Sequence, residues 1–241
     1  MGARVKPTAK SNRLATFSWI LYDLANTPYS MNVVSLYFTT WITVELMRPE
    51  FYVSLVNSLS MIFVALTMPA LGEWSDRRAK KMPALFLFTM VCIIGTFFMG
   101  VLGRQIGEAA WLLPAILVLF VLTNYCFQGG LVFYNALLPA VSTGKNMGRI
   151  SGYGVALGYV GSILGLVVAR LFVEGEAFGL TVPGVEAGGR VAAFIPTAVL
   201  FFIFALPIFF FVKEPFVPQS KKERWSFIGS YRRIWNTIRN T

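Results

Sequence analysis

Residues 82–103 read MPALFLFTMVCIIGTFFMGVLG, an unbroken run without a charged residue. A helix needs about 20 consecutive apolar residues to cross the hydrocarbon core of a bilayer. This run is apolar around its whole circumference, so a helix formed from it has no side that suits water. The stretch therefore predicts a transmembrane helix, and it sets the class of fold for the rest of the chain.

Five more stretches share this character, and each contains at most one charged residue. In chain order the six expected spans are 14–44, 51–72, 82–103, 109–138, 150–171 and 191–212. Residues 139–144, which prolong the fourth apolar run, are expected at the membrane interface because one span cannot use so many residues. We predict an all-α membrane protein in which residues 14–212 form a six-helix bundle, between a basic N-terminus (1–13) and a basic tail (213–241).

The composition agrees with this class and excludes several others. Of 241 residues, 56% are hydrophobic and 13% are charged, against about 25% charged in soluble domains. The chain has no histidine and two cysteines, Cys92 and Cys126, which fall inside expected spans and should stay reduced. Since no metal cluster and no nucleophile with a base is visible, we expect no enzyme, no cofactor and no metal site.

The basic residues alternate from one loop to the next. Of 21 Lys and Arg residues, 17 lie before the first span, after the sixth, or in the loops after the second and fourth. The positive-inside rule then places both termini in the cytoplasm. Charges that alternate by loop do not form one basic face, so nucleic acid is not the expected partner. We expect a bacterial inner or plasma membrane and a retained first span, because the apolar run after Arg13 is too long for a signal core.

Asp23 is the only ionisable residue inside the first expected span. Such a group costs at least about 2.5–3.5 kcal/mol in hydrocarbon, so it indicates a function by default. Asp23 shares one side of the helix with Asn26 and Thr27 and follows Tyr22, while Pro28 predicts a kink or break beside it. This polar stripe predicts a helix that lines a pathway for a solute or a coupling ion. The alternative is an Asp23 that is protonated and only bonds a neighbouring helix.

The fourth expected span repeats this pattern. Asn124, Gln128 and Asn135 lie within about 40° of one another around the helix, and Gly129–Gly130 interrupt the apolar run. Two polar, interrupted helices at matching places in a three-plus-three arrangement are typical of transporters built from two inverted three-helix repeats. Amide side chains that only bond between helices are the alternative.

The fifth expected span contains a regular series of glycines. Gly154, Gly158, Gly161 and Gly165 form two pairs with three residues between their members, a spacing that lets helix backbones approach closely. We therefore predict that this helix packs tightly against a neighbour. The glycines do not fit a phosphate-binding loop, because no strand precedes them.

The loop between spans two and three resembles a signature of the major facilitator superfamily. It reads Gly72-Glu-Trp-Ser-Asp76-Arg77-Arg78-Ala-Lys80-Lys81 and keeps the glycine, the Asp-Arg pair and the basic pair of that signature, while Trp74 and Ala79 depart from it. The resemblance implies a tight helix exit at Gly72 and a cytoplasmic gate formed by Asp76 with the basic residues. An ordinary basic loop is the alternative.

Two more stretches resemble the vacuole-effluxer family (autophagy-related permease-like) within that superfamily. They are Trp19-x-x-Tyr22-Asp23-x-Ala25-Asn26-Thr27-x-Tyr29, and Tyr134-Asn135-x-x-x-Pro139 followed by Gly148-Arg149-x-Ser151-Gly152-x-Gly154-x-Ala156-x-Gly158-Tyr159. The family's usual Ser is replaced by Thr27. Because fungal members export amino acids from the vacuole, the resemblance implies a small solute, with amino acids as candidates, and also allows a vacuolar membrane.

Length is the main departure from this resemblance. The superfamily fold has twelve helices in two halves, so the resemblance implies that this chain is the N-terminal half and that residues 213–241 link it to the next. Phe227, Tyr231 and Trp235 share one face of this tail with arginines around it, which predicts an amphipathic helix on anionic lipid. A solvated linker is the alternative.

The sequence thus predicts a secondary active transporter for a small solute that works by alternating access in the lipid bilayer. Asp23 is the candidate coupling or cation-binding carboxylate, and protons are the candidate coupling ion. The expected partner is a second six-helix half or a second copy of the chain. The alternative is a six-span membrane subunit, or an inactive half, that does not transport.

Overall fold

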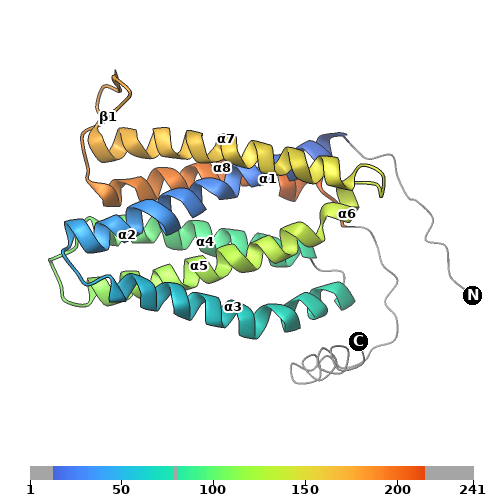
Figure 1. Cartoon of the computed structure of the whole chain (residues 1–241), viewed down its shortest axis with the longest axis horizontal. Helices are drawn as coiled ribbons and strands as arrows, with labels where there is room; N and C mark the ends of the chain where they lie inside the picture. The colour runs from blue at the N-terminus through green and yellow to red at the C-terminus, as the bar shows by residue number, and fades with distance from the viewer. Residues whose placement is uncertain (1–12, 79–80, 215–241) are drawn as a thin grey trace, which may run out of the picture.

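The computed structural model describes residues 13–78 and 81–214, which form a bundle of long helices (Figure 1). The elements in chain order are α1 (Arg13–Pro28), η1 (Tyr29–Tyr37), α2 (Phe38–Thr40), η2 (Trp41–Glu45), α3 (Phe51–Arg78), α4 (Lys81–Gly103), α5 (Leu112–Ala136), α6 (Leu138–Val141), α7 (Met147–Glu174), β1 (Glu176–Ala177), β2 (Leu180–Thr181), η3 (Arg190–Ala193) and α8 (Phe194–Phe211). Elements η1 and η2 are π-helices, and η3 is a 3₁₀-helix. Apart from the small antiparallel pair β1–β2, the described chain is helical, as predicted.

Five helices of the described chain are long and apolar enough to cross a membrane. They are Phe51–Ser75, Lys81–Gly103, Leu112–Ala136, Met147–Glu174 and Arg190–Phe211. They correspond to the second to sixth expected spans. The chain is therefore an all-α membrane protein with five candidate spans among its described residues.

Residues 13–45, which contain the first expected span (14–44), form a helical path in four pieces. The regular helix α1 ends at Pro28, and the π-helices η1 and η2 enclose the short α2. Pro28 has no backbone N–H, so the carbonyl of Leu24 loses its usual partner within the helix. The π-helical turns, which occur frequently at functional sites, begin at the next residue. Because no α-helix in this path reaches the length of a span, the first expected span stays a prediction.

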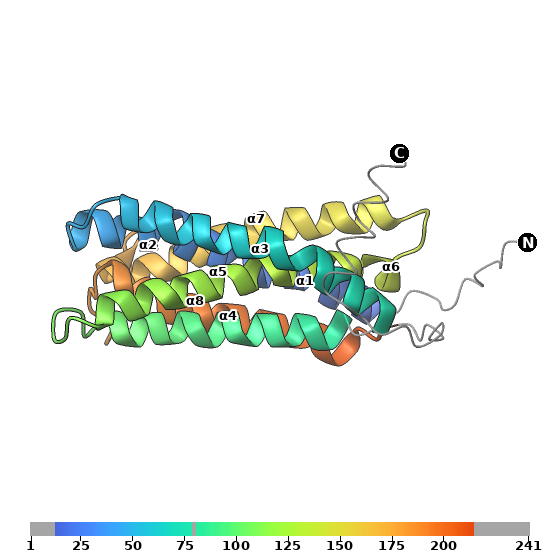
Figure 2. The same cartoon turned by 90° about the horizontal axis from the view of Figure 1, so that it is seen from below.

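The long helices pack in two groups. Helix α1 packs against α7 and α8, α5 packs against α3 and α4, and a contact between α4 and α8 joins the groups. Figure 2 shows α3 and α7 along one side of the bundle and α4 and α8 along the opposite side. Helices α1 and α5 therefore lie in the middle of the bundle.

The helices differ from the expected spans mainly at their ends. Helix α3 continues through Gly72 to Arg78, so the tight exit predicted at Gly72 is wrong. Residues 73–78 include Glu and two Arg, which favour helix, and a helix can continue as it leaves the membrane. Helix α7 runs on to Glu174 and is closed by Gly175, whose φ of 79° is left-handed. Helix α6 occupies part of the stretch expected at the interface.

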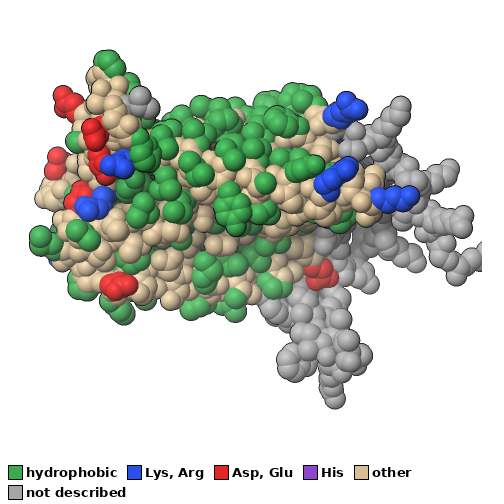
Figure 3. Space-filling model, turned by 45° about the horizontal axis from the view of Figure 1, so that its top comes forward, with side chains coloured by type: hydrophobic (Ala, Val, Ile, Leu, Met, Phe, Trp, Pro, Cys, Tyr) green, Lys and Arg blue, Asp and Glu red, His purple; other side chains and the backbone are tan. Residues whose placement is uncertain are grey.

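Charged side chains gather at the two ends of the bundle, and the flank in view between them is largely apolar (Figure 3). We call the end where α1 begins and α5 ends the basic end; it holds Arg13, Lys81, Lys145 and Arg149. We call the opposite end the acidic end; it holds Glu45, Glu50, Glu108, Glu174, Glu176 and Glu186 together with four arginines. This separation leaves Asp23 as the one Asp, Glu, Lys or Arg residue away from both ends of the described helices.

Aromatic side chains fasten the first helical path to the middle of the bundle. The ring of Phe38 stacks on Phe120 of α5 with 3.9 Å between centroids. Tyr29 donates a hydrogen bond of 2.9 Å to the hydroxyl of Thr123, also on α5. These contacts hold the π-helical turns in place although their own hydrogen-bond geometry is uncommon.

Candidate functional site

Asp23 lies half-buried on α1 within a small polar group. The amide of Asn26 is 3.5 Å from Asp23 Oδ1, and the hydroxyl of Thr27 donates a 2.6 Å hydrogen bond to the backbone carbonyl of Asp23. Asn26 is buried, whereas Asp23 and Thr27 are partly exposed. The structure therefore brings together three of the residues predicted from the sequence, and all three come from one helix.

The glycines of α7 make room for this polar group. A Cβ atom added at Gly154 would lie 2.5 Å from Asp23 Oδ2, and one added at Gly158 would lie 3.0 Å from Thr27 Oγ1. Both positions thus place bare backbone against a polar side chain. Any larger residue there would compete with the carboxylate or the hydroxyl for space.

The same stripe of α7 also meets the break in α1. A Cβ at Gly161 would lie 2.5 Å from the carbonyl oxygen of Leu24, which cannot accept the usual α-helical hydrogen bond from Pro28. A Cβ at Gly165 would lie 2.7 Å from Pro28 Cβ. The glycines of α7 therefore fit closely against the backbone of α1 around Pro28.

An aromatic stack adjoins Asp23, and two of its rings belong to Trp19 and Tyr22, which precede Asp23 on α1. Trp19 stacks on Tyr134 with 4.4 Å between ring centroids, and Tyr22 stacks on the same Tyr134 at 4.8 Å. Trp19 Nε1 donates to the carbonyl of Tyr134, and the hydroxyl of Tyr134 donates to the carbonyl of Trp19, both at 3.1 Å. Tyr22 and Thr89 of α4 have their hydroxyls 2.7 Å apart. These bonds join α1, α4 and α5 between Asp23 and the basic end.

The amides predicted on the fourth span do not join the group around Asp23. Asn124 is fully buried and faces α3, where its Nδ2 donates to Ser60 Oγ at 2.8 Å and to Asn57 Oδ1 at 3.3 Å. Its Oδ1 has no hydrogen-bond partner among the described residues. Gln128 is half-buried and Asn135 is exposed. The stripe is present on α5, but its members have different surroundings.

Asn32, in the π-helix η1, was missed by the sequence reasoning. It is fully buried and donates from Nδ2 to the carbonyl of Gly165 and to Thr197 Oγ1, both at 2.9 Å. It thus links the first helical path to α7 and α8. Its Oδ1 also has no partner among the described residues. The signal was available, because a buried amide in an apolar run needs partners wherever it occurs.

The predicted gate loop is described only in part. Gly72 lies within α3, and an added Cβ there meets nothing within 4 Å. Asp76, Arg77 and Arg78 form the last turn of α3, but their side chains lie outside the described part of the chain, as does the whole of Lys80. The predicted amphipathic face of the tail also lies outside it. Lys81 begins α4 and donates from Nζ to the carbonyl of Ala136, 3.4 Å away at the end of α5.

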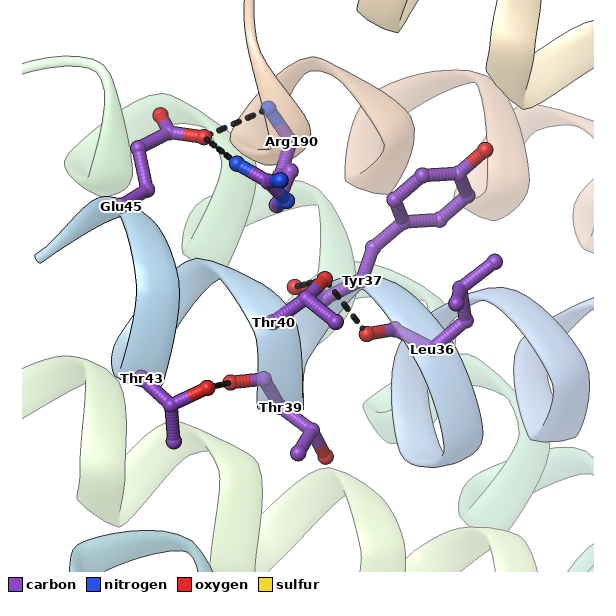
Figure 4. Close-up of polar contacts among 7 residues, drawn as sticks. All are labelled: Leu36, Tyr37, Thr39, Thr40, Thr43, Glu45 and Arg190. Atoms are coloured by element: carbon purple, nitrogen blue, oxygen red, sulfur yellow. Dashed lines mark hydrogen bonds and ion pairs between the residues drawn. The ribbon is translucent and has the colours of Figure 1, made fainter. Parts of the chain in front are cut away.

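An ion pair closes the acidic end of the first path (Figure 4). Glu45 Oε2 accepts the backbone N–H of Arg190 at 3.1 Å and its Nη1 at 3.3 Å, so that the carboxylate caps η3 as well as pairing with the arginine. Thr40 and Thr43 return their hydroxyls to the backbone carbonyls of Leu36 and Thr39. Both hydroxyl groups therefore find their hydrogen-bond acceptors within the same helical path. Among the described residues, no group of three or more Cys, Asp or Glu side chains could hold a metal ion.

A family model described as "Major Facilitator Superfamily" matches residues 24–241. The chain belongs to this superfamily. An uncharacterised MFS-type transporter, YxiO of Bacillus subtilis, is 27% identical over 92% of this superfamily chain and 51% of its own length. The multidrug resistance protein MdtG of Yersinia enterocolitica is 25% identical over 77% of the chain and 39% of its own length.

The chain spans about half the length of these relatives, or less. An uncharacterised protein of Aquifex aeolicus shows the same relation, with 27% identity over 41% of its length. The superfamily consists of membrane transporters, not enzymes. The chain is accordingly a multi-pass integral membrane protein of a transporter family, and its bacterial relatives point to a plasma membrane.

Proposed function

We propose that this chain is one six-helix half of a secondary active transporter that moves a small solute by alternating access. The observation that carries the proposal is the polar group of Asp23, Asn26 and Thr27, set within a bundle whose flank is apolar and packed against bare glycine backbone. A carboxylate at this depth needs a positive partner, which a proton or a cationic solute can provide. Asp23 is the proposed coupling or cation-binding residue.

The packing of the helices supports two inverted three-helix repeats. If residues 13–45 are the first span, the six spans in order are 13–45 (which begins with α1), α3, α4, α5, α7 and α8. Two three-helix repeats then pair α1 with α5, α3 with α7, and α4 with α8. Replacing each helix by its counterpart turns the contact of α1 with α7 into the contact of α5 with α3. The same exchange converts the contact of α1 with α8 into that of α5 with α4, and leaves the contact of α4 with α8 unchanged. This correspondence is what two related units would produce, and transporters place their sites between such units.

A second half, or a second copy of the chain, is the proposed partner along α3 and α7. In each of these two helices, 22% of the most apolar 18-residue segment is buried, against 39–50% in the corresponding segments of α4, α5 and α8. They lie along one side of the bundle (Figure 2). Helix α7 exposes Tyr153 and Tyr159, at 57% and 69%. Because a tyrosine hydroxyl in mid-membrane is better placed against protein than lipid, this side fits a partner.

The charges favour a cationic or neutral solute group next to Asp23. Within the six expected spans, Arg170 near the acidic end is the only Lys or Arg. Amino acids, suggested by the vacuole-effluxer resemblance, would therefore place their ammonium group at Asp23 and their carboxylate in the other half. The relatives described as multidrug resistance proteins make lipophilic cations the second substrate class to test. The gate loop at 72–81 is proposed to lie in the cytoplasm with both termini.

Transport in reconstituted proteoliposomes tests the function. Labelled amino acids and a lipophilic cation are offered with and without an imposed pH gradient, using the chain alone and with any partner that copurifies with it. We expect flux that depends on the gradient and loses this dependence in Asp23→Asn. Glu186→Gln, which changes an exposed acidic residue of the loop between β2 and η3, is the matched control.

Two outcomes would contradict the proposal. An unaltered pH dependence in Asp23→Asn removes the coupling role of this carboxylate. A correctly folded chain and partner that move none of the offered solutes favour the alternative, a membrane subunit that does not transport.

A further inference from the structure

The carboxylate of Glu214, which follows α8, lies on the first turn of α4. Glu214 Oε1 accepts the backbone N–H of Lys81 at 2.9 Å, and Oε2 is 3.3 Å from the backbone N–H of Met82. The first turn of a helix leaves its N–H groups without partners inside the helix. Pro83 has none to offer, so Glu214 takes up two of the three N–H groups at positions 81–84. An anion is also favoured here by the helix dipole.

Lys81 carries the connection on to a third helix. Its ammonium group donates to the carbonyl of Ala136, the last residue of α5, at 3.4 Å. Free carbonyls and the negative end of the dipole make a helix C-terminus a favourable place for a cation. The backbone N–H of Lys81 therefore binds the carboxylate of Glu214, while its ammonium group binds the C-terminal end of α5. Glu214 and Lys81 are half-buried, which limits screening by solvent.

We propose that Glu214 is a positioning residue that fastens the exit of α8 to the start of α4 and, through Lys81, to the end of α5. The inference rests on the proposed function, since Lys81, whose backbone Glu214 contacts, is one of the residues of the proposed gate. In this arrangement the chain leaving α8 moves together with the basic ends of α4 and α5. The edge-on contact of Phe86 with Phe209, at 5.2 Å between centroids, keeps α4 and α8 in register nearby.

Hydrogen exchange measured by mass spectrometry in lipid nanodiscs tests the fastening without relying on transport. Loss of a helix cap corresponds to roughly fivefold faster opening of the amides it protects. In Glu214→Ala we expect about this increase in peptides containing residues 81–86, and a smaller increase at residues 131–137. Lys81→Met, which keeps the aliphatic stem, should accelerate residues 131–137 and leave residues 81–86 close to wild type. Glu186→Ala is the control, with no change at either place.

The outcomes separate this inference from the proposed function. Unchanged exchange at residues 81–86 in Glu214→Ala overturns the fastening, and a change there without one at 131–137 overturns its transmission through Lys81. Glu214→Gln, which retains one acceptor oxygen, guards against misfolding and should lie between wild type and Glu214→Ala. If the chain proves unable to transport, the exchange results still decide the fastening. If it transports, Glu214→Ala should lower kcat several-fold with little change in KM, because Glu214 touches no solute.

Discussion

At position 154, the missing side chain leaves the space that the carboxylate of Asp23 occupies. Gly154→Ala is therefore expected to displace this carboxylate, and a misplacement of about 1 Å at a working group lowers rates by tenfold or more. Initial rates of solute transport measure the effect. Gly152→Ala is the matched control on the same helix, since nothing lies within 4 Å of its Cβ position. Equal rates in the two variants would argue against a role for Asp23.

Glu45 makes two kinds of contact with Arg190, and mutations separate them. Arg190→Met removes an exposed ion pair, worth about 0.2–1 kcal/mol, but keeps the backbone N–H that Glu45 caps. Glu45→Ala removes both, and a helix cap alone contributes about 0.5–2 kcal/mol. We expect the free energy of unfolding, measured by denaturant titration in mixed micelles, to fall by about 1 kcal/mol more in Glu45→Ala. Equal losses would mean that the cap contributes nothing.

Residue type alone predicted some of these roles and not others. Asp23 was identified because a carboxylate inside an apolar run is costly, and its closeness to Asn26 and Thr27 follows from helical spacing. Asn124 was placed on a stripe correctly, yet helical spacing does not say which neighbour a stripe faces, and the neighbour is α3. Asn32 could have been singled out as an amide in an apolar run, but its partners, Gly165 and Thr197, could not be predicted because they lie far away in the sequence.

For pairs of helices, the contact of α1 with α7 depends on backbone meeting backbone at Gly161. A methyl group there cannot be accommodated by a side-chain rotation, because the atom 2.5 Å away is the carbonyl oxygen of Leu24. We expect Gly161→Ala to lower the free energy of unfolding by about 1–3 kcal/mol, the usual cost of overpacking. Gly152→Ala should be neutral or slightly stabilising because alanine favours helix. Denaturant titration of both variants is the measurement, and similar values would contradict the close contact.

Elements were predictable where a pattern runs along one helix. Apolar runs without charge predicted the helices that begin at Phe51, Lys81 and Leu112 to within three residues. Pro28 predicted a break, but nothing in the sequence distinguishes a kinked α-helix from the π-helical turns of η1. The helix exit predicted at Gly72 was wrong, because a glycine is compatible with the end of a helix and equally with a helix that continues.

For the whole molecule, the side formed by α3 and α7 should be covered in the native membrane. With Cys92 and Cys126 replaced by alanine, single cysteines at Tyr159 on α7 and Phe210 on α8 have nearly equal exposure, 69% and 70%. We expect a lipid-soluble maleimide to label Tyr159→Cys several-fold more slowly than Phe210→Cys. Equal rates would mean that both helices face lipid and that no partner covers this side.

The pairing of the carbonyl of Leu24 with Gly161 has a consequence for the history of the family. Pro28 cannot donate the usual helical hydrogen bond to that carbonyl, and only a residue without a side chain can approach the carbonyl from α7. Substitutions at positions 28 and 161 should therefore depend on each other. Among descendants of the same ancestor, we expect a side chain at position 161 to appear only where position 28 is no longer proline. An ancestral substitution at one site would thus have opened the way for change at the other, across more than half the length of the chain.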